Sequence, residues 1–269
     1  MTEQTAMTDQ AQGELAEALD RAAVSDVLLV ALDFDGTLSL HQDDPMAARA
    51  LPEAVRAIAE LVRLPRTTVA FISGRSLADL RIIAEHDDAS QVLLAGSHGA
   101  EFWFPGVGAV EPAEADADVA LRDRLRAEAE AIVADIPGTF IEPKTFGFGV
   151  HTRLASPDDA RRADAGVDAL VAEKAPAWRR RTGKNIVEYA FRHEGKDSAV
   201  AALRERVHAT CVVYAGDDTT DEDALASLGA GDLGIHVGAG PTAATVSVPS
   251  PPAMAEALLA LATARAARE

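Results

Sequence analysis

Short apolar runs alternate with amphipathic segments along the N-terminal part of the chain. The apolar runs cover residues 27–34, 67–73 and 92–96, and helical periodicity marks the segments 52–63 and 76–86 between them. An apolar run of this length, closed by turn residues, indicates a strand buried on both faces. Its alternation with helices predicts a parallel sheet with helices on both sides.

The same alternation returns in the C-terminal part, after Lys196. The predicted elements there are a helix to about His208, strands at 211–216, 233–238 and 245–248, and helices beginning at Asp221 and Pro252. Consecutive parallel strands need crossover connections, which these helices supply. Together the two parts predict an α/β fold with a Rossmann-like, doubly wound parallel sheet as its core.

Residues 105–194 interrupt this pattern. Two long helices, 114–134 and 157–175, alternate there with the strands 146–153 and 185–191, whose residues are apolar and polar by turns. Such alternation is typical of a sheet with one covered face. The segment is therefore expected to be a smaller α+β cap domain, inserted into the core and acting as a lid.

The pattern also predicts where the domains begin and end. The expected division is a disordered segment 1–11, a catalytic core of 12–104 and 195–269, and the cap domain 105–194. Pro105 with Gly106, and Gly195, are the expected hinge positions, because proline and glycine interrupt regular structure.

Acidic residues outnumber basic ones: 43 Asp and Glu stand against 25 Lys and Arg, a formal net charge of -18. This charge opposes binding to nucleic acid and to anionic membranes, but an anionic small molecule is compatible with a cleft that holds a divalent cation. No signal peptide or membrane span is apparent, so a cytoplasmic protein is expected. Cys211, the only cysteine, lies in an apolar run and is expected to be a buried thiol.

Polar residues stand where the predicted strands end. They are Asp33, Asp35, Ser73, Asp217 and Asp218, with Lys196 just ahead of a helix that flanks the sheet. Ligands of open α/β sheets gather at the carboxyl ends of the strands, so these side chains are expected to converge. Carboxylates from two strand ends suit Mg²⁺; calcium is the alternative, but the acidic stretch 216–223 is too short for a twelve-residue calcium loop.

Each of these residues also has an ordinary structural interpretation. Asp33 fits a helix cap or a turn, Ser73 fits a strand-to-helix turn, and Lys196 fits a solvated side chain. The acidic stretch 216–223 fits the first turn of a helix, where the helix dipole favours negative charge. Their common placement at strand ends, in this order, favours a catalytic site over four separate explanations.

Four short segments match, in order, the motifs of a known superfamily. DFDGT at 33–37, Ser73, Lys196 and GDD at 216–218 resemble the motifs of the haloacid dehalogenase superfamily, and the resemblance covers about residues 27–238. Within this superfamily, three longer segments and the position of the insert resemble trehalose-6-phosphate phosphatases. These segments are SGR at 73–75, GSHGAE at 96–101 and GDDTTDED at 216–223. The resemblance implies a Mg²⁺-dependent phosphatase of trehalose 6-phosphate that works alongside a trehalose-6-phosphate synthase.

The resemblance implies roles for the strand-end residues that their chemistry also supports. Asp33 is the expected nucleophile, since a carboxylate that takes up the phosphoryl group divides ester hydrolysis into two displacements. Asp35 is expected to protonate the leaving sugar oxygen and later to deprotonate water. Ser73 and Lys196 are expected to bind the phosphoryl oxygens and neutralise their charge.

Magnesium is the expected cofactor. Its expected ligands are Asp33, the carbonyl group of Asp35, and Asp217. Asp221 resembles the superfamily's outer carboxylate, which orients a metal-bound water. Asp218 is expected to hold Lys196 in place.

The resemblance places sugar recognition in the insert. Its candidate residues are Glu142, Lys144, Arg153, Lys184 and Glu188. Carboxylate and ammonium groups suit a sugar ring, because the acid accepts hydrogen bonds and the cation donates them. Glu142 and Lys144 alternate with apolar neighbours, however, and equally fit the wet face of a sheet. Arg75 and His98 of the core are candidates for contact with the sugar or its phosphate.

Two positions depart from the usual pattern of this family. Glu188 is followed by YAFRHE without an early proline, and Lys196 is followed by Asp197 instead of glycine. Alternatives are therefore a phosphatase of another disaccharide or glycosyl-polyol phosphate, a phosphomutase, and a non-catalytic regulatory partner of a trehalose-6-phosphate synthase. Asp35 favours a phosphatase or mutase, and the presence of every motif argues against a non-catalytic chain.

Overall fold

The structure is a computed structural model that describes residues 7–42, 44–110, 115–183 and 185–268. The chain divides into two units: Met1–Val110 with Gly195–Glu269, called the core unit here, and Glu111–Glu194, called the insert unit. Among the described helices, none combines the length and the hydrophobicity that crossing a membrane requires.

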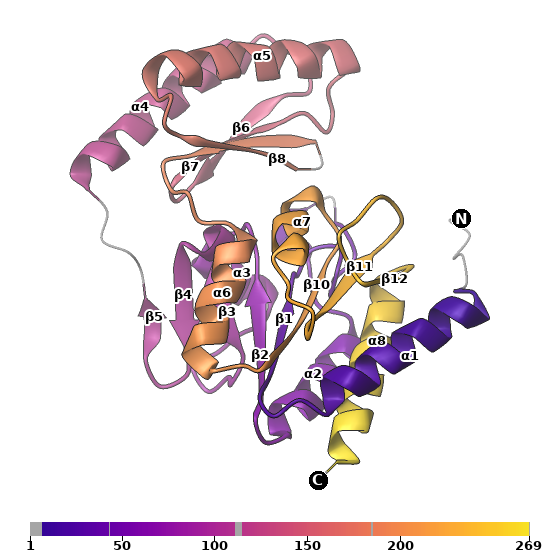
Figure 1. The fold of residues 1–269 in the computed structure, drawn as a ribbon. Helices are drawn as coiled ribbons and strands as arrows, with labels where there is room; N and C mark the ends of the chain where they lie inside the picture. Colours follow the sequence, from indigo (N-terminus) through magenta and orange to yellow (C-terminus); the bar gives the residue numbers. More distant parts are fainter. Residues whose placement is uncertain (1–6, 43, 111–114, 184, 269) are drawn as a thin grey trace. The chain divides into compact units, whose positions relative to one another are not determined.

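A sheet of eight strands forms the centre of the core unit, in the order β12-β11-β10-β1-β2-β3-β4-β5. The strands are β1 (Leu28–Leu32), β2 (Thr67–Ile72), β3 (Leu93–Gly96), β4 (Glu101–Phe104), β5 (Gly108–Val110), β10 (Cys211–Gly216), β11 (Leu233–Val237) and β12 (Val246–Val248). Neighbours pair in parallel except at β3–β4 and β4–β5. The predicted α/β fold is confirmed, with an antiparallel hairpin added at one edge (Figure 1).

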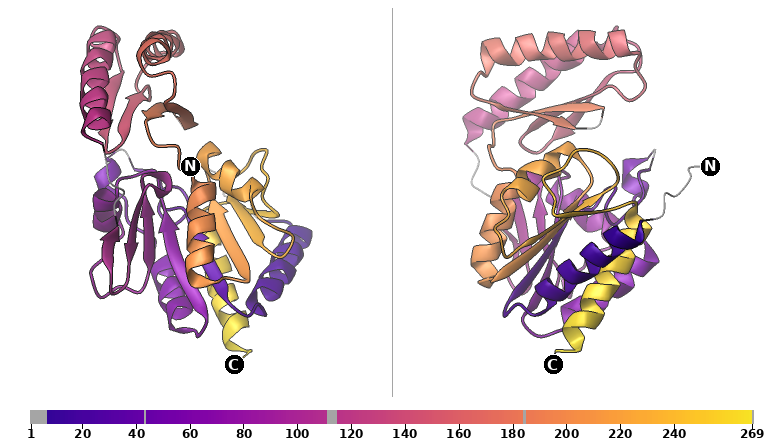
Figure 2. Two further views of the ribbon diagram at one scale, coloured as in Figure 1. Left: turned by 60° about the vertical axis from the view of Figure 1, so that its left-hand side comes forward. Right: turned by 45° about the vertical axis from the view of Figure 1, so that its right-hand side comes forward.

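Helices cover both faces of this sheet (Figure 2). They are α1 (Asp9–Ala23), α2 (Pro52–Arg63), α3 (Leu77–Ile83), α6 (Lys196–Val207), α7 (Thr219–Ala226) and α8 (Pro251–Ala266), with short 3-10 helices η1 (Pro45–Ala47) and η2 (Ser97–Gly99). Leu28 and Val30 of β1 pack with α1, α2, α3 and α8, whereas Leu29 and Ala31 pack with α6 and α7. The strand is therefore buried on both faces, as its apolar run predicts. Cys211 is likewise buried, as expected.

Pro105 and Gly106 form a tight turn inside the core unit, between β4 and β5. The N–H of Val107 donates to the carbonyl oxygen of Phe104 across this turn, and Gly106 has a φ of 73°. These residues therefore close a hairpin instead of forming a hinge, and the insert unit begins at Glu111 instead of residue 105. Proline followed by glycine marks both kinds of site, and the pattern alone did not distinguish them.

Helix α1 begins at Asp9, inside the segment 1–11 for which the sequence predicts disorder. Thr8 caps the helix by accepting a hydrogen bond from the N–H of Ala11, and Leu19 packs into the core. The first turn of this helix is polar, so the apolar periodicity of the sequence did not reveal where the helix begins. Residues 1–6 lie outside the described residues.

The insert unit is an antiparallel sheet of four strands, in the order β6-β7-β9-β8, with two helices on one face. The strands are β6 (Phe140–Lys144), β7 (Gly147–His151), β8 (Arg179–Gly183) and β9 (Ile186–Ala190), and the helices are α4 (Asp116–Val133) and α5 (Pro157–Lys174). Phe148, Val150 and Val187 pack against the helices. The alternating residues of the same strands therefore lie on the opposite face.

Candidate active site

The carboxyl ends of three neighbouring strands meet beside Asp33. Strand β1 pairs in parallel with β10 on one side and with β2 on the other, so the chain leaves all three at the same edge. Asp33 follows β1, Ser73 follows β2 and Asp217 follows β10. One carboxylate oxygen from each of Asp33, Asp217 and Asp221 lies within 4.8 Å of the others. The structure thus brings together three residues expected around a metal.

Lys196 is the buried cation of this cluster. It is the first residue of α6, and its Nζ lies 2.6 Å from Oδ1 of Asp33 and 2.7 Å from Oδ1 of Asp221. Burial by itself lowers the pKa of an ammonium group, but attraction to Asp221 and Asp33 outweighs burial and raises the pKa of Lys196. Lys196 is therefore a lasting positive charge beside both carboxylates.

Asp221 orients Lys196. Its Oδ1 also accepts a hydrogen bond from the Tyr214 hydroxyl, and its Oδ2 accepts one from the backbone N–H of Asp218, at 3.0 Å. Gly216 makes room for this carboxylate, because a Cβ there would lie 2.2 Å from the Asp221 carboxyl carbon. Asp221 thus holds Lys196 as the sequence analysis expected of Asp218. The Asp218 side chain instead caps α7, because it turns toward the first backbone N–H groups of that helix.

Asp217 packs directly against the backbone of Gly36. Gly36 has a φ of 82°, and a Cβ on it would lie 2.1 Å from Oδ2 of Asp217. Position 36 therefore needs glycine both for its backbone conformation and for the position of this carboxylate. His41, which the sequence analysis did not single out, has its Nε2 3.1 Å from the same oxygen.

The donor atoms of the cluster fit a hard divalent cation, for which carboxylate oxygens are preferred ligands. Burial raises the pKa of Asp33 well above its usual range; Lys196 opposes this, but Asp221 and Asp217 raise the pKa further. One ammonium therefore does not fully compensate three close carboxylates, and a bound cation would. Asp33 and Asp217 suit direct ligation best, since the oxygens of Asp221 already accept three hydrogen bonds.

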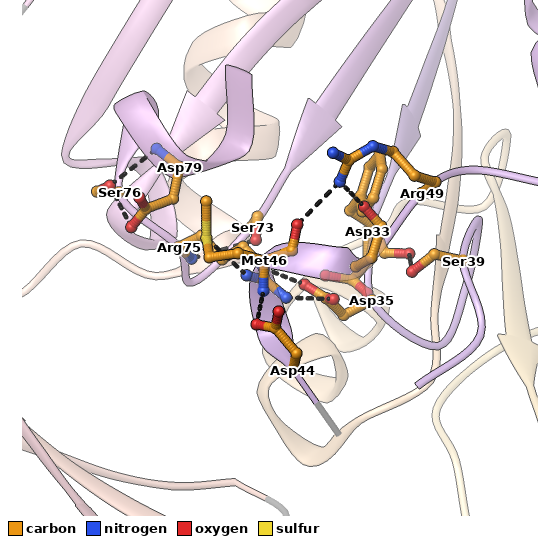
Figure 3. Close-up of polar contacts among 12 residues, drawn as sticks. Asp33, Asp35, Ser39, Asp44, Met46, Arg49, Ser73, Arg75, Ser76 and Asp79 are labelled. Atoms are coloured by element: carbon orange, nitrogen blue, oxygen red, sulfur yellow. Dashed lines mark hydrogen bonds and ion pairs between the residues drawn. The ribbon is translucent and has the colours of Figure 1, made fainter. Parts of the chain in front are cut away.

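Asp35 and Arg75 form a bidentate ion pair (Figure 3). Nε of Arg75 lies 2.6 Å from Oδ2 of Asp35, and Nη2 lies 2.7 Å from Oδ1. Both residues were expected at the site, but the contact between them was not.

Ser73 and His98 are buried next to Arg75. The Ser73 hydroxyl accepts a hydrogen bond from the Arg75 N–H at 3.1 Å, and the His98 N–H donates to the Ser73 carbonyl oxygen at 2.9 Å. The imidazole of His98 packs over Gly74, where a Cβ would lie 2.7 Å from its ring atoms. Backbone hydrogen bonds and a glycine therefore hold these two expected residues together within the core unit.

In the insert unit, three residues expected to contact sugar lie together on the sheet face opposite α4 and α5. Glu142 of β6 and Glu188 of β9 both pair in register with Gly149 of β7. Nζ of Lys144 lies 2.9 Å from Oε2 of Glu142 and 3.2 Å from Oε1 of Glu188. His151, which the sequence analysis missed, has its Nε2 2.9 Å from Oε2 of Glu142.

These charges stabilise one another. Burial opposes the ionisation of Glu142, but a hydrogen bond from His151 and the attraction of Lys144 outweigh it and lower the pKa of Glu142 to about 2. Burial likewise disfavours the charged form of Lys144, but attraction to Glu188 and Glu142 raises the pKa of Lys144. The face therefore presents charged acceptors and a charged donor side by side.

Two candidates of the insert unit remain, Arg153 and Lys184. Arg153 is exposed in the turn that follows β7. Lys184 lies outside the described residues.

The chain is similar to known proteins over most of its length. A family model described as trehalose-phosphatase matches residues 31–258. The trehalose-phosphate phosphatase of Mycobacterium tuberculosis is 32% identical over 265 residues, which cover 92% of this chain and 66% of that protein. The trehalose-phosphate phosphatase of Mycobacterium leprae is 30% identical over 241 residues, covering 84% and 54%. The chain thus spans just under two thirds of the length of the first relative and just over half of the length of the second.

Solved structures share the fold. The C-terminal domain of Candida albicans trehalose-6-phosphate phosphatase has a TM-score of 0.80 at 23% identity, covering 93% of this chain and 96% of that one. An Aspergillus fumigatus trehalose-6-phosphate phosphatase has a TM-score of 0.68 at 25% identity, covering 93% and 97%. A haloacid dehalogenase-like hydrolase from B. subtilis has a TM-score of 0.58 at 15% identity, covering 86% and 98%.

Proposed function

Since the chain belongs to the trehalose-phosphatase family, we propose that it is a metal-dependent phosphatase that hydrolyses trehalose 6-phosphate to trehalose and phosphate. The observation that carries this proposal is the cluster of Asp33, Asp217 and Asp221 around a buried lysine at the carboxyl ends of the strands. Burying several charged groups costs free energy, so such a cluster is not explained by the stability of the core. A site for a cation and a phosphoryl group accounts for it.

Asp33 is the proposed nucleophile. Its carboxylate oxygen would attack phosphorus and displace the sugar oxygen, which leaves Asp33 phosphorylated; water would then attack the same phosphorus, release phosphate and restore the carboxylate. Lys196 contacts Asp33 directly and would keep a positive charge beside the phosphoryl oxygens in both steps. Ser73, at the end of the neighbouring strand, would donate its hydroxyl to the phosphoryl group.

Asp35 is the proposed acid and base. It would give a proton to the leaving sugar oxygen in the first step and take a proton from water in the second. Each oxygen of Asp35 accepts one hydrogen bond from Arg75, so a proton on Asp35 would weaken this ion pair. A phosphate group competes for a guanidinium, which binds it in the same bidentate manner. Arg75 is therefore proposed to turn from Asp35 to the substrate phosphate.

The proposed cofactor is Mg²⁺. Asp33, Asp217 and the carbonyl group of Asp35 would hold it, and Asp221 would support them through Lys196 and a bound water. When bound, it would neutralise the charge of the phosphoryl oxygens.

The insert unit is proposed to recognise the sugar. Glu142 and Glu188 would accept hydrogen bonds from sugar hydroxyls, and Lys144 would donate to them. His98, Arg153 and Lys184 are proposed as further contacts to the substrate. If different residues bind the sugar and the phosphoryl group, substitutions in the insert unit should change sugar specificity without changing catalysis.

Phosphate release from a panel of sugar phosphates tests this proposal. Selective hydrolysis of trehalose 6-phosphate, abolished by EDTA and restored by Mg²⁺ but not by Ca²⁺, would support it. Glu142→Ala should raise KM for trehalose 6-phosphate and leave hydrolysis of p-nitrophenyl phosphate unchanged. An equal loss with both esters would contradict the assignment of sugar recognition to Glu142.

The same panel decides between the alternatives. Preference for another disaccharide phosphate or a glycosyl-polyol phosphate would change the substrate but keep the chemistry. Return of the phosphoryl group to a sugar hydroxyl would indicate a phosphomutase. No turnover of any ester, together with a changed rate of a trehalose-6-phosphate synthase on mixing, would indicate a regulatory partner.

A further inference from the structure

An exposed aromatic residue lies at one end of the polar face of the insert unit. Phe140 is 50% exposed, and it faces His151 directly in the β6–β7 register. The two rings stack, with centroids 4.7 Å apart and planes 7° from parallel. The imidazole therefore covers one face of the phenyl ring, while half of Phe140 stays accessible.

His151 also fixes the neighbouring carboxylate. Its Nε2 lies 2.9 Å from Oε2 of Glu142, and Nζ of Lys144 lies 2.9 Å from the same oxygen. Both contacts reach Oε2, so within the part of the chain that the structure describes Oε1 is left to accept a hydrogen bond from a ligand. The lowered pKa of Glu142 keeps this acceptor ionised at neutral pH.

Gly149 of β7 pairs in register with both Glu142 and Glu188, so no side chain of β7 separates the two carboxylates. The side chain of Ile186 lies over this glycine, because a Cβ on Gly149 would be 2.7 Å from Cδ1 of Ile186. The face therefore carries carboxylates on two strands, an apolar side chain over the glycine, and Phe140 at one end.

We propose that Phe140 and His151 form, with Glu142, a subsite for one sugar ring. Phe140 covers the apolar face of the ring, where the C–H groups lie, and Glu142 accepts from the hydroxyls at its rim. His151 is a positioning residue, because it acts on the sugar through Glu142 and through the stacked phenyl ring. The proposal rests on the proposed function and adds a specificity-determining aromatic contact to it.

The proposed subsite explains why an exposed phenyl ring lies beside a charged acceptor, which the stability of the fold does not require. An exposed phenyl ring gains little free energy from its own fold, since half of its surface stays in water. A pyranose ring offers the matching partner, an apolar face bordered by hydroxyl groups. A contact between Phe140 and this face would therefore help to distinguish one sugar phosphate from another.

Three substitutions separate the aromatic contact from the hydrogen bond. Phe140→Leu keeps an apolar side chain but removes the ring. His151→Phe keeps a ring against Phe140 but removes the donor to Glu142, whereas His151→Gln keeps a donor of similar reach but removes the ring. Leu154→Ser is the matched control, since Leu154 is 79% exposed in the same unit and lies outside the polar face.

The readouts are kcat and KM for trehalose 6-phosphate and for p-nitrophenyl phosphate, which has no sugar. We expect Phe140→Leu and His151→Phe to raise KM for trehalose 6-phosphate about three- to tenfold, with kcat and p-nitrophenyl phosphate hydrolysis unchanged. His151→Gln should recover part of the loss seen with His151→Phe, because the hydrogen bond to Glu142 returns. Thermal unfolding confirms that each variant is folded.

Several outcomes would overturn the inference while leaving the proposed function intact. These are an unchanged KM in both Phe140→Leu and His151→Phe, an equal change with both esters, or an equal effect of Leu154→Ser. In each of them the unsubstituted protein still hydrolyses trehalose 6-phosphate. If the unsubstituted protein hydrolysed no sugar phosphate, the proposed function would be wrong, and the subsite with it.

Discussion

The ammonium nitrogen of Lys196 lies 2.6 Å from Oδ1 of Asp33, although 163 residues separate them in the sequence. Lys196 begins α6, which follows the insert unit in the sequence, and Asp33 follows β1, which precedes it. Both side chains are almost wholly buried, so water screens their attraction only weakly. This pair joins the two segments of the core unit at the proposed phosphoryl site.

Lys196→Met should destabilise the protein and stop phosphate release. Without the ammonium, Asp33, Asp217 and Asp221 repel one another in a buried cluster; breaking such a pair costs about 3–5 kcal/mol of unfolding free energy. Loss of a charge that stabilises the transition state should lower kcat at least about 100-fold. Urea unfolding and a phosphate-release assay measure the two effects.

Lys174→Met is the matched control for Lys196→Met. Lys174 pairs with Glu128, but its side chain is 39% exposed, so its loss should cost less than about 1 kcal/mol. Equal free energies of unfolding in the two variants would show that the buried ion pairs of Lys196 stabilise the protein no more than the exposed pair of Lys174. Added Mg²⁺ should recover more stability in Lys196→Met than in the unsubstituted protein, because it compensates the unpaired carboxylates.

Gly36→Ala should weaken metal-dependent activity. The added methyl group would meet Asp217, and the φ of 82° disfavours any residue with a Cβ. We expect the Mg²⁺ concentration for half-maximal phosphate release to rise at least about tenfold, because Asp217 must move. A titration of activity against Mg²⁺ measures this shift.

Gly106→Ala separates backbone strain from displacement of Asp217. Gly106 also has a positive φ, 73°, but a Cβ on it would meet nothing within 4 Å. This control should lose about 1 kcal/mol of stability and keep the Mg²⁺ requirement of the unsubstituted protein. A similar metal titration for both alanine variants would refute the steric explanation.

His86 should make the core unit less stable in mild acid. Burial lowers its pKa from the usual 6.5, because the charged imidazole loses water, although its Nε2 donates to the Val92 carbonyl at 3.0 Å. Between the lowered pKa and 6.5 the unfolded chain binds more protons than the folded one, so the free energy of unfolding rises with pH in this window and falls in acid.

His86→Phe should remove this part of the pH dependence. Urea unfolding at several pH values between about 5 and 7.5 would show a smaller slope than in the unsubstituted protein. His193→Gln, at an exposed histidine, is the control and should leave the slope unchanged. An unchanged slope in His86→Phe would mean that His86 does not titrate differently on folding.

Much of the core unit could be predicted from the sequence, because a doubly buried strand leaves a plain signal. The predicted strand 27–34 contains β1, and the rule that ligands gather at the carboxyl ends of strands correctly predicted that Asp33, Asp217 and Lys196 lie close together. The rule did not distinguish the roles of Asp218 and Asp221. Asp218 caps α7, whereas Asp221, one turn of helix later, points inward to Lys196. The order of these residues in the sequence does not show which of the two points inward.

Other features depend on contacts that no local pattern records. Strand β8 escaped detection because its first three residues are all arginines. Arg180 pairs with Asp168 of α5, at 2.7 Å, and the sequence pattern does not record this contact. Tyr214 reads as one more apolar residue of β10, but its hydroxyl binds Asp221. His151 becomes significant only once the strand register places it beside Glu142.

Covalent capture of the phosphoryl group on Asp33 is the central claim, and trapping the enzyme during turnover tests it most directly. Protein quenched within the first turnovers of trehalose 6-phosphate, reduced with borohydride and digested, can be read by mass spectrometry, because borohydride converts a phosphorylated aspartate to homoserine. The account predicts homoserine at position 33, dependent on substrate and Mg²⁺, and none in Asp33→Asn, which should be folded but inactive. Rapid phosphate release with Asp33 unmodified, or turnover retained by Asp33→Asn, would contradict it.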